Sequence, residues 1–151
     1  MRAFALAGLL AVATPAAACD LPANAAGLMA DAGANMNAQR KAGGRRALDR
    51  DARLDKAAQA HACWMAETNS FSHKGARGSL PKRRITATGY RPMLTAENIA
   101  FGQTTGGQVI AEWMASSGHR KNILLGSVDD YGVGVALMQE RPVWVMVYAG
   151  K

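Results

Sequence analysis

Residues 97–125, ENIAFGQTTGGQVIAEWMASSGHRKNILL, carry the clearest structural and functional signals in this chain. Thr105 followed three residues later by Gln108 matches a capping box, which predicts a helix that begins at Gly106-Gly107. After this start, apolar side chains recur at helical spacing: Val109, Ile110, Trp113 and Met114. We therefore expect a helix that packs through its tryptophan face and ends at Gly118.

Two polar side chains flank this helix at positions that favour a functional site. His119 directly follows Gly118, so the sequence places its imidazole in a turn that a packed helix holds in position. Glu97 opens the stretch, and the preceding pair Arg91-Pro92 favours an extended connection into it. The stretch thus brings a carboxylate and a histidine to the two ends of one helix.

Two downstream segments rich in valine and aromatic residues predict an antiparallel hairpin. They span 131–138 and 143–148, and the four residues 139–142 join them. Their apolar residues do not alternate with charged ones, so we expect both faces of each strand to be covered. Small residues share one face of the first strand: Gly132, Gly134 and Ala136. They would let a helix approach that face closely.

Upstream of the 97–125 stretch, the pattern predicts two longer helices and one short one. The first spans 25–41 and ends at Gly43-Gly44, and a short third helix opens at Pro81. Asp51 caps the second helix, whose apolar stripe has these members: Leu54, Ala58, His61 and Met65. Because His61 lies on this stripe, we predict a buried histidine bonded to the backbone rather than a catalytic one.

Helices before and above a hairpin predict an α+β protein, a three-layer α/β/α sandwich with a central antiparallel sheet. At 151 residues the chain is long enough for one buried core and too short for two ordinary domains. We divide it into a signal peptide (1–18), an N-terminal segment with the start of the first helix (19–34), and one domain (35–151). We expect this domain to be a monomer.

The first residues have the pattern of a secretory signal peptide. Arg2 precedes an apolar run of roughly a dozen residues, and small residues stand at the cleavage positions up to Ala18. The run is too short to span a bilayer, which takes about 20 apolar residues, and no later segment comes near that length. We expect a mature protein without a transmembrane segment, in the periplasm or outside the cell.

The chain has two cysteines, Cys19 and Cys63, and an even number in an oxidising compartment favours a disulfide. Cys63 lies about 180° from Leu54 on the helical wheel, so it faces away from that stripe, where an N-terminal segment could be joined to it. A cut after Ala18 would also suit a lipid anchor on Cys19. Lipoprotein signals usually carry a larger aliphatic residue where Ala16 stands, so the disulfide is favoured.

The mature chain is basic, because without Arg2 it has 17 basic and 11 acidic residues and a net charge of +6. The basic residues cluster in two runs: Arg40-Lys41 with Arg45-Arg46 and Arg50, and Lys74 and Arg77 with Lys82-Arg83-Arg84. We interpret these runs as a solvated face, with attraction to an anionic envelope polymer or lipid headgroups as the alternative. Nucleic acid is not an expected partner, because no nucleic-acid-binding motif is present.

The order of several short motifs resembles the CAP superfamily of SCP-like domains, which includes cysteine-rich secretory proteins, antigen five and plant pathogenesis-related group-one proteins. The similarity is to its short bacterial branch and covers about residues 35–148. Its motifs are Asn37, Arg40 and Gly43; Leu54 and Ala57-Ala58; Phe71-Ser72-His73; Arg84-Ile85, Ala87 and Gly89-Tyr90; Glu97-Asn98-Ile99-Ala100; Trp113-Met114, Ser116, Gly118-His119-Arg120 and Asn122-Ile123-Leu124; and Gly132-Val133-Gly134.

This resemblance implies an α/β/α sandwich with a shallow cavity lined by two histidines and acidic residues. His73, Glu97 and His119 match three of those positions. The segment that supplies a second cavity glutamate in animal and plant members is missing, and Glu112, about 130° from the apolar stripe, is a poor replacement. Residues 120–122 stand where eukaryotic members have threonine-glutamine-valine, so the activities of those relatives transfer poorly.

Two histidines and one glutamate suit zinc or another divalent cation with one position left for water, which makes His73, Glu97 and His119 possible metal ligands. The alternative is a hydrogen-bonded cluster that ties loops to the sandwich. No catalytic residue is established, and the candidates are His73, Glu97 and His119. Ser72, Ser116 and Ser117 neighbour histidines but lack a nucleophile-elbow motif. We predict a binding or envelope-associated module for a small ligand, a lipid or an anionic envelope polymer. The rival is a metal-dependent hydrolase of envelope polymer or peptide.

Overall fold

The computed structural model describes residues 19–151, so the predicted signal peptide (1–18) lies outside the described residues. The described residues form five α-helices, a short 3₁₀ helix and four strands. The helices are α1 (Ala25–Ala42), α2 (Ala52–Thr68), η1 (Ala76–Gly78), α3 (Pro81–Ala87), α4 (Gly106–Ala115) and α5 (Ser117–Ile123). The strands are β1 (Asp49–Arg50), β2 (Leu94–Phe101), β3 (Asp130–Met138) and β4 (Arg141–Gly150).

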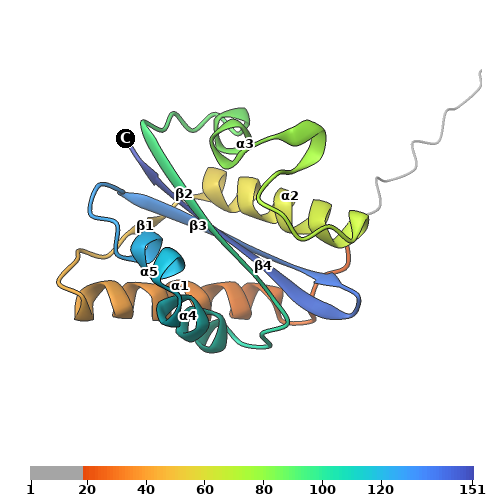
Figure 1. Ribbon diagram of the computed structural model, residues 1–151, viewed down its shortest axis with the longest axis horizontal. Helices are drawn as coiled ribbons and strands as arrows, with labels where there is room; N and C mark the ends of the chain where they lie inside the picture. The colour runs from red at the N-terminus through yellow and green to blue at the C-terminus, as the bar shows by residue number, and fades with distance from the viewer. Residues whose placement is uncertain (1–18) are drawn as a thin grey trace, which may run out of the picture.

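The strands form one mixed sheet in the order β1-β3-β4-β2. The β3–β4 and β2–β4 pairs are antiparallel, and the two-residue β1 pairs parallel with β3. Figure 1 shows the sheet between two helical layers, with α2 and α3 on one side and α1, α4 and α5 on the other. The predicted α+β three-layer sandwich is therefore confirmed.

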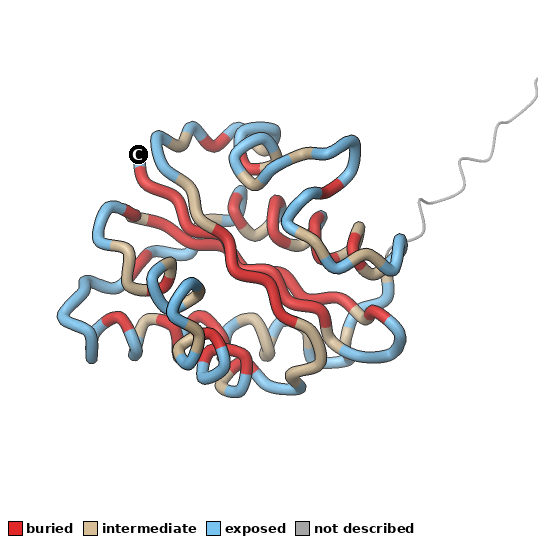
Figure 2. Tube along the Cα trace, in the orientation of Figure 1, coloured by how far each residue is buried: buried red, intermediate tan, exposed pale blue. Residues whose placement is uncertain are grey.

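The two core clusters lie on opposite faces of this sheet, and both faces are covered as predicted (Figure 2). On the α2 face, a Cβ on Gly132 would lie 2.1 Å from the backbone of Leu54, and one on Gly134 would lie 2.4 Å from the backbone of Gln59. The small residues of β3 thus admit α2 in close contact. On the other face, Trp113 and Trp144 are fully buried.

The turn between β3 and β4 is shorter than predicted. Gln139 and Glu140 both have positive φ, 50° and 61°, which makes a two-residue hairpin loop. Such a loop matches the right-handed twist of the flanking strands, so strand pairing extends to residues 141 and 142, which were expected in the loop. Pro142 consequently lies inside β4 opposite Leu137, near the start of the strand, where a missing N–H is tolerated.

Strand β2 is an element that the sequence showed only as an extended connection. It pairs with β4 along its whole length, from Leu94 opposite Gly150 to Phe101 opposite Val143. Its signal is weak because polar residues interrupt the apolar run, yet Glu97 and Asn98 are buried. The strand therefore carries polar side chains into the interior.

The helix predicted from Gly106 to Gly118 is two helices. Thr105 Oγ1 accepts a hydrogen bond from the Gln108 N–H as expected, but Gln108 returns its bond to the Thr104 N–H instead of the Thr105 N–H. Ser116 adopts an extended conformation (φ −93°, ψ 123°) that ends α4 and starts α5. Gly118 therefore continues α5, and the prediction that His119 lies in a turn is wrong.

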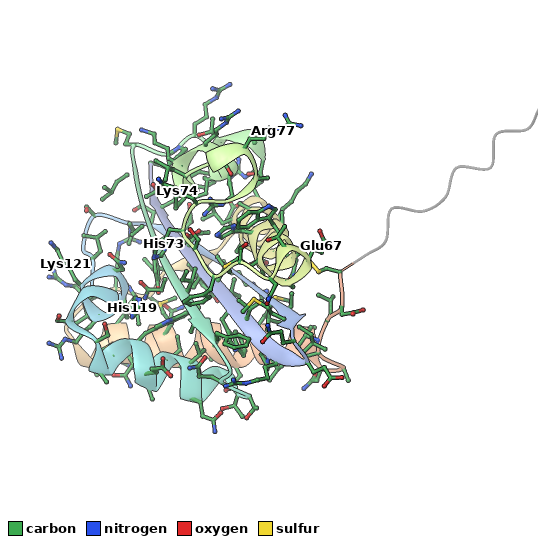
Figure 3. The ribbon with its side chains drawn as sticks, turned by 45° about the vertical axis from the view of Figure 1, so that its right-hand side comes forward. Glu67, His73, Lys74, Arg77, His119 and Lys121 are labelled. Atoms are coloured by element: carbon green, nitrogen blue, oxygen red, sulfur yellow. A yellow bond between two sulfur atoms is a disulfide. The ribbon has the colours of Figure 1, made fainter. Side chains whose placement is uncertain are left out.

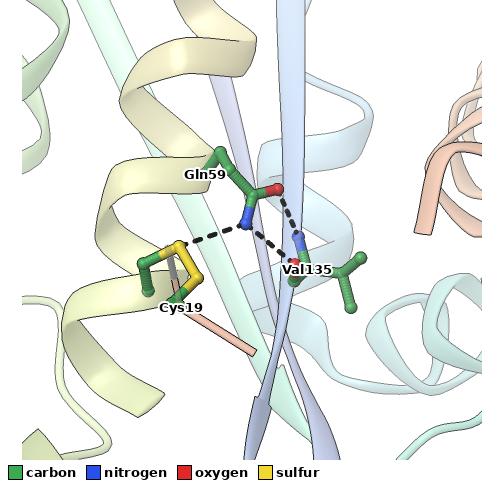
Figure 4. The surroundings of a disulfide bond; sticks show 4 residues. Cys19, Gln59 and Val135 are labelled. Carbon is green, nitrogen blue, oxygen red and sulfur yellow. Dashed lines mark hydrogen bonds between the residues drawn. A yellow bond between two sulfur atoms is a disulfide. The ribbon is translucent and has the colours of Figure 1, made fainter. Parts of the chain in front are cut away.

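The predicted disulfide between Cys19 and Cys63 is present and joins the N-terminal segment to α2. Gln59, one turn before Cys63, binds both backbone groups of Val135 on β3 through its side-chain amide (Figure 4). The same amide nitrogen lies 3.4 Å from Cys63 Sγ. This contact connects the disulfide, α2 and the sheet.

The interpretation of the basic runs as a solvated face is wrong for Arg40, which is fully buried. Its guanidinium donates to the backbone carbonyls of Arg46, Ile123 and Leu125 and thereby ties α1 to the end of α5. Carbonyl oxygens at a helix end have no partner within the helix, so an arginine there satisfies them.

Within residues 19–151, no helix combines the length and apolarity needed to cross a bilayer.

Candidate ligand-binding site

His73 and Glu97 form the centre of the site. His73 lies in the loop after α2, and its Nδ1 is 2.8 Å from Glu97 Oε1 on β2. A carboxylate oxygen accepts, so Nδ1 carries the proton and His73 Nε2 keeps its lone pair. The His73 side chain is 51% exposed, whereas that of Glu97 is 1% exposed. Glu97 therefore lies behind His73 and fixes its tautomer.

Arg84 on α3 holds the other side of Glu97. Its Nη2 donates to Glu97 Oε2 at 2.5 Å, and its Nη1 donates to the backbone carbonyls of His73 and Ser79. Arg84 thus fixes both the carboxylate and the loop that carries His73. The interpretation of the basic runs as a solvated face is therefore also wrong for Arg84, whose side chain is only 11% exposed. In the sequence, the role of Arg84 could have been suspected because the residue belongs to the motif Arg84-Ile85-x-Ala87.

His61 on α2 is buried and bonded to the backbone, as predicted. Its Nε2 lies 2.9 Å from the Ser72 carbonyl oxygen, which can only accept, so Nε2 carries the proton. Burial lowers the pKa of His61 below its usual value; the charge of Arg84 lowers it further, and Glu97 opposes both. The same Nε2 is 4.0 Å from Glu97 Oε1, a proximity that the helical pattern did not reveal.

His119 reaches the site from α5. Asn98 on β2 donates to the His119 carbonyl oxygen at 3.1 Å, and Asn122 donates to Asn98 Oδ1 at 2.8 Å, so these amides fix α5 to the sheet. The His119 ring lies 6.4 Å from the Trp113 ring. Burial lowers the pKa of His119 and His73 lowers it further, while Glu112 acts in the opposite direction.

His73 and His119 line one open depression of about 610 Å³. The side chains around it are Phe71, Ser72, His73, Lys74, Ile99 and His119. Figure 3 shows His73 and Lys74 on the loop after α2 and His119 on α5. The structure thus brings the two predicted histidines together, whereas Glu97 does not line the depression because it is buried behind His73.

The donor set limits how this depression would hold a metal. Among residues 19–151, no group of three or more His, Cys, Asp or Glu side chains is placed to hold a metal ion. Catalytic zinc sites use three protein ligands, and here an ion would find two imidazoles. Both oxygens of Glu97 already accept hydrogen bonds, from His73 and from Arg84, and the side chain is only 1% exposed, so its carboxylate is not presented to an ion in the depression. The ligand set of His73, Glu97 and His119 stays a prediction.

No activated nucleophile appears in the described part of the chain. Ser72 Oγ accepts from the Lys74 N–H, and neither His73 nor His119 has a serine hydroxyl as a hydrogen-bond partner among residues 19–151. Glu112 is exposed and pairs with Gln103 outside the depression. The arrangement suits recognition of a hydrogen-bonding or anionic group, since it offers two imidazoles and one ammonium.

Comparisons with known proteins agree with this geometry. The profile of the CAP family, the cysteine-rich secretory protein family, matches residues 34–148. The uncharacterized protein YkwD of Bacillus subtilis (strain 168) is 35% identical over 115 residues, which is 76% of this chain and 44% of that protein.

Two solved structures have a similar fold. An extracellular protein containing an SCP domain from Bacillus anthracis str. Ames superposes with a TM-score of 0.78 at 26% identity, over 84% of this chain and 41% of the other. An outer surface protein from Borrelia burgdorferi gives a TM-score of 0.71 at 22% identity, over 79% and 89%. The chain spans less than half the length of the two Bacillus proteins. The profile match, the sandwich and the paired histidines together show that this chain belongs to the CAP family of cysteine-rich secretory proteins.

Proposed function

We propose that this protein is an exported binding module that holds an anionic group of a cell-envelope polymer between His73 and His119. One observation carries the proposal: both oxygens of Glu97 are engaged behind His73. The depression therefore presents two imidazoles and the ammonium of Lys74, and none of its lining residues is acidic. An anionic group would gain hydrogen bonds there without facing a carboxylate.

The shape and the surrounding charge favour a polymer over an enclosed small ligand. The depression is open, so an extended chain could cross it and leave at either side. Further exposed cations, Arg77, Lys82 and Arg83, follow Lys74 along η1 and α3. Basic surfaces raise the local concentration of anionic partners and speed their association.

Export to the periplasm or the extracellular space is supported by two observations. The Cys19–Cys63 disulfide suits an oxidising compartment. The similar SCP-domain protein from Bacillus anthracis is extracellular. A binding module outside the cytoplasm would meet envelope polymers directly.

The rival function is a metal-dependent hydrolase, and the His73–Glu97 pair is the feature that favours it. A histidine oriented by a buried carboxylate is suited to act as a general base. Such a mechanism also needs an activated nucleophile or a metal-bound water. If His73 and His119 held a metal ion, that ion would supply the water. Glu97 would then orient His73.

Calorimetric titration with polyglycerol phosphate, at neutral and at mildly acidic pH, tests the proposal. We expect tighter binding in acid, because a protonated imidazole attracts phosphate more strongly than a neutral one. Zinc would behave oppositely, since it needs neutral imidazoles. Salt should weaken polymer binding.

Matched lysine variants locate the binding surface. Lys74→Ala should weaken polymer binding, whereas Lys41→Ala, an exposed lysine on α1, should not. Equal loss in both variants would show attraction to net charge alone, and absence of binding would overturn the proposal. Turnover of an ester, peptide or glycan substrate that requires zinc and His119 would establish the rival function instead.

A further inference from the structure

A second cavity, of about 330 Å³, has Arg84 in its wall and shares no lining residue with the depression. It opens to solvent between α2, η1 and α3, and neither His73 nor His119 lines it. Its apolar walls are Ala57, Ala60, Trp64, Ala76 and Ala87. Cavities of roughly 300–1,000 Å³ with mostly apolar walls and a few polar groups are typical of small-molecule sites.

The polar end of this cavity contains a buried acceptor without a partner. His61 lines the cavity, and its Nδ1 is buried and has no hydrogen-bond partner in the described structure. Because Nε2 donates to the Ser72 carbonyl, Nδ1 of the neutral ring offers a lone pair. Buried polar atoms are nearly always paired with protein, water or ligand, so this atom calls for a donor.

Two more polar atoms of the cavity wall gather near His61 Nδ1. A Cβ on Gly75 would lie 3.0 Å from His61 Nδ1, 3.0 Å from Ser79 Oγ and 3.3 Å from Arg84 Nη1. Gly75 has φ −99°, a value open to other residues, so its backbone conformation does not require glycine. Glycine at this position keeps a side chain from covering the three polar atoms.

The cavity also has an aromatic wall. The rings of His61 and Trp64 stack with centroids 5.6 Å apart and planes 10° from parallel. Trp64 is half-buried, whereas Trp113 and Trp144 are fully buried and donate to the backbone carbonyls of Ile99 and Gln103. Flat apolar molecules pack well against such a wall.

From this geometry we propose that the cavity binds a small, uncharged aromatic molecule carrying one N–H or O–H donor. The donor meets His61 Nδ1, and the ring lies against Trp64 and the alanines. A cavity of about 150 Å³ is enough to bind benzene in another protein, so the volume here suits a one- or two-ring molecule. Glu97 neutralises Arg84, the cation at the polar end, and Lys56, the other cation of the wall, is exposed to solvent, so an uncharged ligand meets no unpaired buried charge.

Indole and 1-methylindole are matched probes, since only indole has the N–H donor. Titration of ¹⁵N-labelled protein should shift the Trp64 indole signal saturably and leave the Trp113 and Trp144 signals in place. We expect 1-methylindole to bind at least about tenfold more weakly, because it leaves Nδ1 unpaired. Equal affinity of the two probes, or no shift at Trp64, would overturn the proposal.

Two variants on α2 separate the cavity from the rest of the surface. Ala60→Leu narrows the cavity and should abolish the indole shift, whereas Ala52→Leu, exposed at the start of the same helix, should keep it. His61→Phe should make the two probes bind equally. If His61→Phe does not fold, the comparison of Ala60→Leu with Ala52→Leu still tests the proposal. Retained indole binding in Ala60→Leu contradicts it. Shifts confined to His73 and His119 would place the probe in the depression and also contradict it.

Discussion

His73 and His119 line the same depression, but different forces hold them there. His73 lies on a loop, half exposed, and is tied to a buried carboxylate that Arg84 holds in turn. His119 lies on α5, where amide contacts to its backbone and the nearby Trp113 ring fix it. One half of the site therefore depends on buried charge, and the other half depends on packing.

Because the forces differ, the two halves are sensitive to different substitutions. A buried ion pair costs desolvation energy and holds only while both partners remain, so loss of one partner leaves an uncompensated charge. A packed helix tolerates polar changes at its surface but not the loss of the side chain that fills the core beneath it. We therefore expect core variants to disturb His119 and charge variants to disturb His73.

The largest effect should come from Trp113→Ala on the packed half. Trp113 is fully buried, and truncation of a buried tryptophan typically costs about 3–5 kcal/mol of unfolding free energy. Urea unfolding followed by circular dichroism measures the loss. Trp64→Ala, at a half-buried position, is the control and should cost less. If Trp113→Ala has the same urea midpoint as the parent protein, packing of Trp113 does not hold α4 and α5 in place.

Loss of the disulfide should cost nearly as much but change neither histidine. The bridge spans 44 residues, for which loop-closure entropy gives about 3–4 kcal/mol. The double variant Cys19→Ser/Cys63→Ser should unfold at lower urea with unchanged His73 and His119 NMR signals. Changed histidine signals would show that the bridge also shapes the site. A lipid found on Cys19 by mass spectrometry would replace the bridge with an anchor.

Glu97→Ala should lower the free energy of unfolding by about 3 kcal/mol, at the lower end for a broken buried ion pair. Arg84 keeps two backbone carbonyl partners after the change, which limits the penalty. The variant should free the His73 ring while the His119 signals persist. The double variant Glu97→Leu/Arg84→Met removes both charges and should cost less than the sum of the single changes. An additive result would mean that the two charges are not coupled.

Acid should weaken the fold by a smaller amount. Burial lowers the pKa of both His61 and His119, so the unfolded chain takes up protons first as the pH falls below about 6.5. Their contribution to stability is therefore present at neutral pH and lost in this range. Asp51, whose pKa is lowered to about 2 by its hydrogen bond to Arg53, loses its contribution only in stronger acid. Urea midpoints that do not move between neutral pH and mild acid would contradict this expectation.

The sequence predicts the regular parts of this fold well, because their signals are local. The stripe on α2, the cap at Asp51 and the small residues of β3 each follow from spacing within a few residues. Strand β2 is hidden because it buries Glu97 and Asn98, whose partners come from elsewhere in the chain. The break at Ser116 is hidden because serine is compatible with both helix and cap.

The same contrast between local signals and long-range contacts applies to the site. His73 and His119 are found through motif order, and the structure brings both to one depression. The role of Arg84 and the proximity of His61 to Glu97 depend on how α2, α3 and β2 pack together, which no local pattern encodes. The position of Glu97 behind His73 likewise depends on where β2 lies in the sheet.

The tautomers of the histidines show whether Glu97 orients His73. Long-range ¹H–¹⁵N NMR at neutral pH should show His73 protonated on Nδ1 and His61 protonated on Nε2, two opposite tautomers in one spectrum. Glu97→Gln should release the His73 preference and leave that of His61 unchanged. If His73 is protonated on Nε2 in the parent protein, or keeps its Nδ1 proton equally well in Glu97→Gln, then Glu97 does not orient it.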